Sequence, residues 1–276
     1  MSRQGQPSSD LWVCHLGLIP YSDGVVLQET LRERRATCEL PDTLLLLEHP
    51  PVYTRGRRSG AGDLPLGEDY YRAKGIDVHT TDRGGKLTYH GPGQLVGYPI
   101  MAIDDVGRYV RTMEHAIVDA LAQVGVEAHA RPEDGPDYTG VWVDTPQGEP
   151  TRKIASIGVH VARGVTTHGF AVNVENDLAP FSWVIACGLP DVAMTSIAAE
   201  SGRACEAAAR AGHASAGSAG ERSLVCFRRR MAYAFCQAHG RRQRLVSTAR
   251  LGIDTANASS LKTNTDSPPI PEPALA

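Results

Sequence analysis

The sequence predicts an α+β fold in which a largely antiparallel or mixed sheet is flanked by helices. Three strand patterns within residues 140–174 follow one another through connections too short for a crossover helix, which favours antiparallel pairing. Helical patterns over 25–40, 108–125 and 223–239 lie outside this group of strands, whereas a doubly wound fold would alternate them with strands. A chain of 276 residues with 42% hydrophobic residues can bury the core that such a fold requires.

The first part of the chain predicts a strand, a helix and a second strand. Residues 11–21 form a strand pattern that ends at Pro20, and 43–50 is a short apolar run bounded by proline, as is typical of a buried strand. Between them, the spacing of apolar residues over 25–40 predicts an amphipathic helix. The residues expected to face the core from this helix are Val26, Leu27 and Leu31.

The next part predicts a loop, a strand and a long helix. Residues 51–65 are rich in Gly and Arg and predict a loop, whereas 75–85 predicts a strand that leads into a run of glycines. Helical spacing over 108–125 predicts a helix that ends at Gly125, because glycine readily adopts the left-handed conformation of a C-terminal cap. Its expected core residues are Val110, Met113, Ile117, Leu121 and Val124.

The strongest hairpin signal in the chain is the pair Arg163–Gly164, which joins the strand patterns 153–161 and 167–174. A second turn, at 146–148, joins the first of these strands to the pattern 140–143. We therefore expect three neighbouring antiparallel strands in this part of the chain.

Towards the C-terminus the composition becomes less typical of a packed domain. Residues 200–221 are rich in Ala, Gly and Ser, and predict either a helix with a loose end or a linker, followed by a last helix over 223–239. Beyond it the chain turns to Ser, Thr, Asn and Pro. We therefore expect one catalytic domain over 11–239 and a disordered tail over 240–276.

Composition and charge exclude several classes of function. The net charge of −3 gives no general electrostatic attraction to nucleic acid, and no apolar run approaches the ~20 residues that cross a bilayer. The first ten residues have neither an apolar segment nor an Arg-rich amphipathic pattern, so we expect no targeting peptide. Six scattered cysteines without CxxC pairs predict reduced thiols in a cytoplasmic protein, and no zinc site.

The segment Arg83–Tyr98 has the composition of a wall of a small-molecule site. It contains five glycines and one proline among varied polar residues. Glycine at this density costs conformational entropy, so it indicates positive φ angles or a close approach of the backbone to a ligand. Pro92 lacks the N–H that a phosphate-binding loop would use, which argues against a nucleotide loop. No two histidines have metal-binding spacing, so we expect no metal.

Lys153 is the first candidate for a chemical role. Its neighbours at strand period on either face are apolar or small, so this strand is expected to be buried on both sides. Burial would disfavour the charged form of the amine, which suits a general base. The alternative is a lysine that extends from the strand end to solvent, and on spacing alone this is the commoner case.

Cys187 is the second candidate, because it stands at a turn before Gly188 and Pro190 rather than inside an element. A cysteine at such a turn is accessible to a substrate, as a nucleophile must be, although most unpaired cysteines only fill space in the core. The remaining cysteines lie in strand and helix patterns or, for Cys205, at the surface.

The predicted hairpin brings the two candidates together. If Arg163–Gly164 is the turn, Lys153 lies opposite the end of the second strand, near Val174, and a short stretch of chain returns to Cys187. A cysteine–lysine pair performs acyl transfer: the amine takes the thiol proton and the thiolate attacks a carbonyl. Small residues at Gly169 and Ala171 leave either a groove for an aliphatic chain or room for a close helix–sheet contact.

Four blocks of the sequence resemble the lipoyl(octanoyl) transferase family. RGGKLTYHGPGQLVGYPI is similar to the family's RGG-x-x-T-aromatic-H-x-P-G-Q-x-x-x-Y signature, and EHPPVYTRGRR (48–58) to its upstream block. KIASIGVHVARGVTTHGFAVNV, and ACGLPD followed by MTSI (194–197), resemble its catalytic half. The matching blocks run in order from about Leu16 to Ile197, over most of the expected domain.

The resemblance implies a biotin/lipoate protein ligase-like fold and an acyl-enzyme mechanism without cofactor or metal. It implies that Cys187 is the nucleophile and Lys153 the acid/base residue. The donor would be octanoyl-acyl carrier protein, and the acceptors would be lipoyl domains of the glycine-cleavage H protein and of the E2 component of 2-oxoacid dehydrogenases. The substrate-binding residues that it implies are Arg83, Gly84, Gly85, Lys86, Leu87, Thr88, Tyr89, His90, Ser156, Ile157, Gly158, Gly169, Phe170 and Ala171.

Several alternatives remain open from the sequence. An ATP-dependent lipoate–protein ligase of the same fold would use a lysine but no cysteine, and a catalytically silent module would only bind lipoyl or acyl-carrier domains. His90 is either a structural hydrogen-bonding residue or, with backbone N–H groups of the glycine segment, a group that holds the thioester carbonyl. Arg55, Arg57 and Arg58 form a basic loop that either meets the phosphopantetheine phosphate and the acidic carrier or is simply solvated.

Overall fold

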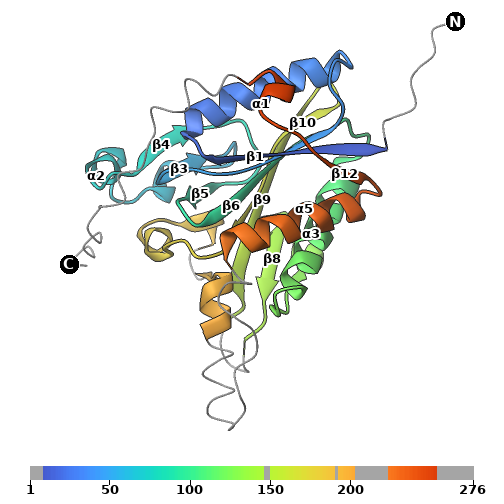
Figure 1. Ribbon diagram of the computed structural model, residues 1–276. Coiled ribbons are helices and arrows are strands. Elements are labelled where there is room, and N and C mark those ends of the chain that lie inside the picture. The colour runs from blue at the N-terminus through green and yellow to red at the C-terminus, as the bar shows by residue number, and fades with distance from the viewer. Residues whose placement is uncertain (1–8, 146–149, 190–191, 203–222, 254–276) are drawn as a thin grey trace, which may run out of the picture.

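The computed structural model describes residues 9–145, 150–189, 192–202 and 223–253. This part of the chain forms a nine-stranded mixed sheet and a separate three-stranded sheet, and helices cover both faces of the larger sheet (Figure 1). The α+β class with a mixed sheet is confirmed. The predicted turn at 146–148, Cys205 and most of the stretch 200–221 lie outside the described residues.

Antiparallel pairs dominate the middle of the larger sheet, and parallel pairs occur where β1 meets both of its neighbours. In spatial order the strands are β12 (Arg242–Leu245), β1 (Asp10–Leu18), β2 (Thr43–Glu48), β6 (Gln94–Ile100), β10 (Val165–Asn173), β9 (Arg152–Ala162), β8 (Gly140–Val143) and β7 (His129–Ala130), and β11 (Ala193–Met194) pairs with β9.

The hairpin of β9 and β10 forms at the predicted turn. Arg163 and Gly164 have φ angles of 52° and 75°, the left-handed values of a two-residue turn that matches the twist of the strands. The pairing continues to Ala155 opposite Val172. Two residues further, the same register brings Lys153 level with Val174, as the sequence predicts.

The first helix, α1 (Tyr21–Ala36), begins directly after Pro20, four residues before its predicted start. Because its buried face runs through Gly24, Gln28 and Leu31, the spacing of one helix face, Val26 points away from the sheet. Val26 is 68% exposed, so its predicted core position is wrong, whereas that of Leu31 is confirmed.

The second sheet corrects the predicted loop over 51–65. Val52–Arg55 forms β3, which pairs in parallel with β4 (Asp77–Thr80) and antiparallel with β5 (Leu87–His90). The short helix α2 (Glu68–Ala73) connects β3 to β4 through Tyr71, whose ring packs edge-on against Tyr53. The strand was missed because only its first three residues are buried before the Arg/Gly run begins.

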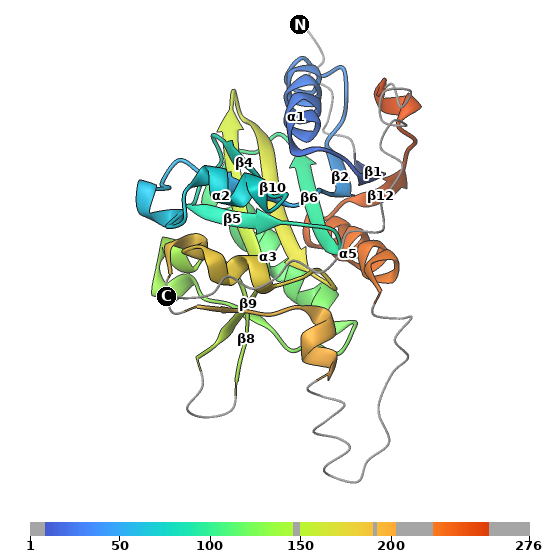
Figure 2. The same ribbon diagram turned by 90° about the vertical axis from the view of Figure 1, so that its left-hand side faces the viewer.

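Helices on opposite faces complete two cores. α1 covers one face, and α3 (Val106–Ala122) and α5 (Leu224–Ala238) pack against each other on the opposite face (Figures 1 and 2). The Asp105 side chain caps α3 by accepting from the Arg108 N–H, and Gly125 follows its end with a φ of 76°. The prediction of this helix and its stop is confirmed.

The domain continues beyond its predicted boundary at 239. Arg242–Leu245 forms β12, which pairs in parallel with β1, and Leu251 is buried against the α1 face of the sheet. The prediction of a disordered tail is therefore wrong for residues 240–253. It failed because an exposed edge strand of sequence RQRL carries little apolar signal. Residues 254–276 lie outside the described part.

Candidate active site

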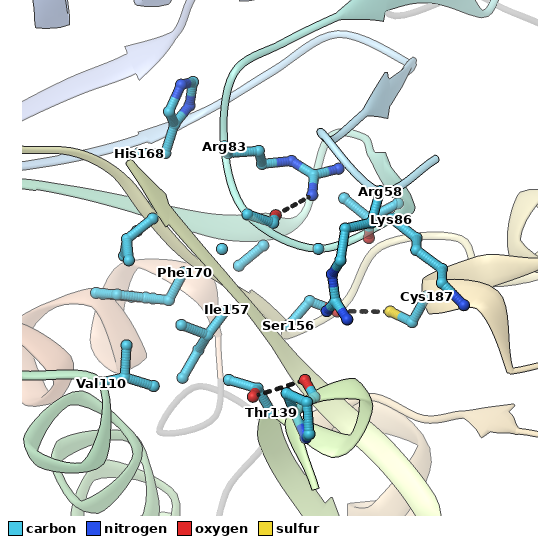
Figure 3. Close-up of a pocket in the computed structure, with 18 of the residues that line it drawn as sticks. Arg58, Arg83, Lys86, Val110, Thr139, Ser156, Ile157, His168, Phe170 and Cys187 are labelled. Atoms are coloured by element: carbon cyan, nitrogen blue, oxygen red, sulfur yellow. Dashed lines mark hydrogen bonds between the residues drawn. The ribbon is translucent and has the colours of Figure 1, made fainter. Parts of the chain in front are cut away.

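A cavity of about 410 Å³ lies between the glycine segment, the first turns of α3, the β9–β10 hairpin and the turn that carries Cys187. Figure 3 shows Cys187 and Lys86 on one side of it and Val110 and Phe170 on the other, with Ser156 and Ile157 between them. One end of the cavity is therefore polar and the other apolar.

The predicted turn places Cys187 at the cavity wall. Ala186–Gly188 forms a single 3-10 turn in which Cys187 itself has a φ of 57°. A φ in this region is strained for a residue with a side chain, and such strain is concentrated at functional sites. The Sγ atom lies 3.8 Å from Ser156 Oγ, the polar contact drawn in Figure 3.

Gly188 keeps the neighbouring lysine close to the thiol. A Cβ atom at this position would collide with Cδ and Nζ of Lys86, so the absence of a side chain lets the Lys86 chain lie across the backbone next to Cys187. The Lys86 ammonium thus supplies positive charge at the reactive end of the cavity.

Lys153 is buried and does not extend to solvent. Only 2% of its surface is exposed, its Nζ donates to the Thr139 carbonyl at 2.9 Å, and it lies 5.0 Å from the centre of the Trp142 ring. The alternative that the sequence favoured, a solvent-exposed strand end, is wrong because β8 pairs alongside and places Trp142 opposite Lys153. A register shift between Val141 and Trp142 produces this pairing.

Lys153 and Cys187 line the same cavity. Among the described residues their hydrogen bonds go to Thr139 and Ser156 rather than to each other. Ser156 follows Lys153 by three residues on β9 and contacts Cys187, so it lies between the two candidate residues.

The backbone of the glycine segment lies directly against β9. The Gly84 N–H donates to the Val159 carbonyl at 2.9 Å, and a Cβ atom on Gly158 would lie 2.7 Å from the Gly84 carbonyl oxygen. The absence of a side chain at Gly158 is therefore needed for the contact, and a side chain at Gly84 would also crowd the Val159 carbonyl. Gly84, Gly158 and Val159 all line the cavity, so this contact is part of its wall.

Arg83 anchors the glycine segment. Its buried guanidinium donates to the Thr54 carbonyl at 2.6 Å and to the Gly84 carbonyl at 2.9 Å. Burial lowers the pKa of Arg83, and the neighbouring Tyr21 and Cys187 oppose this shift. Arg83 fixes the loop that forms the wall, while part of its side chain lines the cavity.

His90 lines the cavity, but its ring nitrogens have partners in the protein. Nδ1 lies 2.7 Å from Gln94 Oε1, and Nε2 lies 3.4 Å from Thr54 Oγ1. Burial, assisted by the nearby His49, holds the pKa of His90 well below its usual value, so the ring is neutral.

Tyr89 is the one predicted substrate-binding residue outside the cavity lining. Its ring packs against Tyr53 and Phe181 in the core beneath the smaller sheet. It points to the other face of β5 because successive side chains of a strand alternate, whereas Thr88 and His90 line the cavity.

The apolar end is built on close backbone contacts. A Cβ atom on Gly97 would collide with the Phe170 ring, so glycine at this position of β6 lets the ring lie flat against the sheet. A Cβ on Gly169 would likewise collide with the Gly97 carbonyl. Small residues therefore set the shape of this end, and an aliphatic chain fits the space that they leave.

Sequence reasoning missed the cavity residues that come from distant parts of the chain. The first turns of α3 contribute to the apolar end, although Val110 was expected only as a core residue. Periodicity identifies the buried face of a helix, but not which cavity it reaches. The missed lining residues are Tyr21, Val96, Tyr98, Val106, Gly107, Val110, Arg111, Pro136, Asp137, Thr139, Val159 and His168. Arg58, which the sequence singled out as part of the basic loop, also lines the cavity.

The basic loop after β3 is partly neutralised by acidic partners. Arg55 pairs with Glu68 at 3.0 Å, and Arg58 pairs with Asp137 at 2.6 Å. Asp137 also lies 3.8 Å from Lys86 Nζ, so one carboxylate joins both cations at the mouth of the cavity. Arg57 is exposed beside them.

No group of three His, Cys, Asp or Glu side chains is arranged to hold a metal ion within the described residues. Likewise, none of the helices in this part of the chain has the length and apolar character needed to cross a bilayer.

The chain is similar in sequence to known octanoyltransferases. Residues 20–211 match the family described as the lipoyl protein ligase A/B catalytic domain. An octanoyltransferase of Acidothermus cellulolyticus is 47% identical over 194 residues, which cover 68% of this chain and 81% of that protein. One from Mycobacterium marinum is 46% identical over 197 residues, which cover 69% and 79%.

The fold is shared with lipoate ligases of much lower identity. A bipartite lipoate protein ligase of Thermoplasma acidophilum superposes with a TM-score of 0.59 at 19% identity, over 86% of this chain and 87% of that one. Lipoate-protein ligase A bound with ATP gives 0.61 at 16% identity, over 86% and 89%. The family match and the close relatives together place this chain in the lipoyl protein ligase A/B catalytic domain family, among its octanoyltransferases.

Proposed function

We propose that this octanoyltransferase moves an octanoyl group from acyl carrier protein to a lysine of lipoyl domains, through a thioester on Cys187. The acceptors would be the glycine-cleavage H protein and the E2 component of 2-oxoacid dehydrogenases, and the reaction would be the first step of protein lipoylation. The observation that carries the proposal is that Cys187 and Lys153 line one cavity whose opposite end is apolar. The described cysteines are all free, which supports a reducing cytoplasm as the site of the reaction.

In the first half-reaction the neutral amine of Lys153 takes the proton of the Cys187 thiol. The thiolate attacks the thioester carbonyl of the donor, the new carbon–sulfur bond forms, and the bond to the phosphopantetheine sulfur breaks. Lys153 then returns its proton to this departing sulfur. The octanoyl chain extends past Ile157 towards Phe170 and Val110, where the lining is apolar.

In the second half-reaction the neutral amine of the acceptor lysine attacks the Cys187 thioester. Its proton passes to Lys153 and from there to the Cys187 sulfur as the carbon–sulfur bond breaks, which restores the starting state. The Lys86 ammonium beside Gly188, and backbone N–H groups of the glycine segment, would stabilise the carbonyl oxygen as it gains charge. Both steps balance without ATP or metal, since a thioester is converted into an amide.

The basic residues at the cavity mouth fit a role in receiving the donor. Arg57 is exposed, and Arg58 shares Asp137 with Lys86. The proposal assigns Arg57 to the acidic carrier surface or its phosphopantetheine phosphate. Arg58 extends instead towards Ser156 and Cys187 (Figure 3), at the end of the cavity where a long phosphopantetheine arm would bring its thioester rather than its phosphate.

Intact-mass spectrometry with octanoyl-acyl carrier protein and no nucleotide tests the proposal. We expect a mass gain of one octanoyl group, mapped to Cys187 by peptide analysis and absent in Cys187→Ser. A lipoate ligase would instead require ATP and retain its activity in Cys187→Ser, and a silent binding module would form no adduct. Either of these results would refute the proposal.

A further inference from the structure

Glu114 is a buried carboxylate on the core face of α3. Its side chain has no exposed surface, although its neighbours on this face, Met113, Ile117 and Leu121, are apolar core residues. A buried charge is costly unless it is paired and hydrogen-bonded. The partners of this carboxylate therefore indicate what it contributes.

Those partners lead directly to Lys153. Glu114 Oε1 accepts from the Gly140 N–H at 2.9 Å, and Lys153 Nζ donates to the Thr139 carbonyl at 2.9 Å. The Thr139 carbonyl and the Gly140 N–H belong to the same peptide group. One peptide group thus lies between a carboxylate on one side and an ammonium or amine on the other.

This arrangement is sensitive to charge as well as to shape. A carboxylate at the N–H increases the negative partial charge of the carbonyl oxygen at the opposite end of the same group, because hydrogen bonds in a chain polarise one another. The carbonyl then holds a positively charged Lys153 more strongly than a neutral one.

Gly140 makes the contact possible. It has a φ of 137°, and a Cβ atom there would lie 2.8 Å from Lys153 Cε and collide with the Ala155 carbonyl. Only glycine lets the peptide group approach the lysine in this orientation. Thr139, Gly140 and Glu114 together therefore form the binding position of the Lys153 amine.

We propose that Glu114 is a positioning residue for the acyl-transfer reaction, which holds Lys153 through the Thr139–Gly140 peptide group and stabilises its protonated form. The inference rests on the proposed role of Lys153 as the proton acceptor. Glu114 itself does not touch the substrate: it acts through the peptide group.

The surrounding charges define the expected pH effect. Glu114 is faced by Arg111, at 2.6 Å, and by His115 and Lys153. The cavity wall around Lys153 also carries Asp137 and Cys187. Burial raises the pKa of Glu114, while the hydrogen bond from the Gly140 N–H and the positive charge of Arg111 oppose the shift. Glu114 is therefore to be tested at pH values well above the usual range of a carboxyl group, where its ionised form prevails.

The test is the rate of Cys187 acylation as a function of pH, from about pH 6 to about pH 9, in Glu114→Gln and the wild type. Glutamine keeps an oxygen that can accept from Gly140 but removes the charge. We expect the plateau rate to fall about tenfold, a fraction of the ~10²–10⁴ that general-base catalysis supplies. We also expect Glu114→Gln to reach half of its maximal rate at a pH that is lower than in the wild type by about half a unit or more. The reason is that the ammonium form of Lys153 loses the negative charge that stabilises it.

Two further variants separate this proposal from a merely structural role. Asp119→Asn removes the same charge from an exposed position of α3 and should change neither the plateau rate nor the half-maximal pH. Glu114→Asp keeps the charge but moves it away from the Gly140 N–H by one methylene. It should lower the plateau and shift the half-maximal pH in the same direction as Glu114→Gln, but by less, and it remains available if Glu114→Gln does not fold.

An unmoved half-maximal pH in Glu114→Gln, or a shift in Glu114→Asp that equals or exceeds the shift in Glu114→Gln, would overturn the proposal. Failure of the wild type itself to form an adduct would refute the proposed function instead, so the two failures are distinguishable.

Discussion

At the scale of single residues, Lys153 shows how neighbouring groups make a lysine near the start of a strand a candidate base. The lysine is enclosed by the Trp142 ring and held by the Thr139 carbonyl. Enclosure keeps water from competing for the amine, and the carbonyl fixes its position relative to the cavity. The proposed mechanism requires that a side chain at this position exchanges a proton and does not only carry positive charge.

Lys153→Arg tests that requirement, because arginine keeps the charge but cannot be deprotonated in a protein. We expect the rate of Cys187 acylation, followed by mass spectrometry, to fall at least ~10²-fold. Lys74→Arg makes the same change outside the cavity and should acylate at the wild-type rate. An active Lys153→Arg enzyme would show that Lys153 does not accept the proton.

At the scale of elements, the start of α3 and strand β10 together form the apolar end of the cavity. Val110 projects into it from the helix, on the same side as Phe170 of the strand (Figure 3). Neither element forms the wall alone. The length of acyl chain that fits should therefore depend on how far the helix side chains reach towards the sheet.

Val110→Ala should extend the tolerated acyl chain by removing two methyl groups from this wall. We expect decanoyl transfer to rise about fivefold relative to octanoyl transfer, measured as the ratio of kcat/KM values, because a methylene in an apolar pocket contributes ~1–3 kcal/mol. Val118→Ala, on the same helix but outside the cavity lining, is the control. An unchanged ratio in Val110→Ala would place the acyl chain elsewhere.

The β9–β10 hairpin carries a local strain that can be relieved. Arg163 is exposed and adopts a φ of 52°, a region that asparagine tolerates better than other residues with side chains. Arg163→Asn should raise the free energy of unfolding by about 0.5–1 kcal/mol, measured by urea denaturation. Arg57→Asn, an equivalent change at another exposed position, should have no such effect. A destabilised Arg163→Asn protein would argue against strain at this turn.

At the scale of the whole molecule, buried histidines should make stability depend on pH. His49 has no exposed surface, and burial lowers its pKa to about 4. Its pKa in the unfolded chain is about 6.5. The contribution of neutral His49 to stability is thus fully present above about pH 6.5. It is lost as the pH falls towards 4, because the unfolded state takes up the proton first.

His49 should account for about 2 kcal/mol of the stability lost between pH 7 and pH 5. In His49→Gln this loss, measured by urea denaturation at the two pH values, should be smaller by that amount, whatever the absolute stability. His115→Gln replaces an exposed histidine and should leave the loss unchanged. An equal loss in His49→Gln and the wild type would mean that His49 is protonated in the folded state at pH 5.

The local parts of this fold follow from the sequence more readily than the long-range ones. The β9–β10 hairpin and the end of α3 shortly before Gly125 could be predicted because turn and cap residues act over a few positions. Strand β12 could not, since its pairing with β1 depends on the opposite end of the chain. The prediction that Val26 lies in the core was wrong because the neighbouring sheet, not the helix alone, determines which face of α1 is buried.

The same distinction applies to the site. Cys187 and Lys153 were identified as candidates from their turn and strand positions, yet the burial of Lys153 depends on β8, which comes from another part of the chain. The contribution of Glu114 was not predictable, because its helical pattern gives no indication that the Gly140 N–H lies beside it. Contacts across the fold decide which candidate side chains become a site.

The central claim, that an octanoyl group on Cys187 is the intermediate of transfer, is tested most directly by a chase experiment. The octanoyl-enzyme is separated from acyl carrier protein and mixed with an unmodified lipoyl domain, without nucleotide, and both masses are followed over time. The account predicts that the enzyme loses one octanoyl group as the lipoyl domain gains one, at a rate no slower than turnover. An adduct that persists, or that is hydrolysed without octanoylation of the domain, would contradict it.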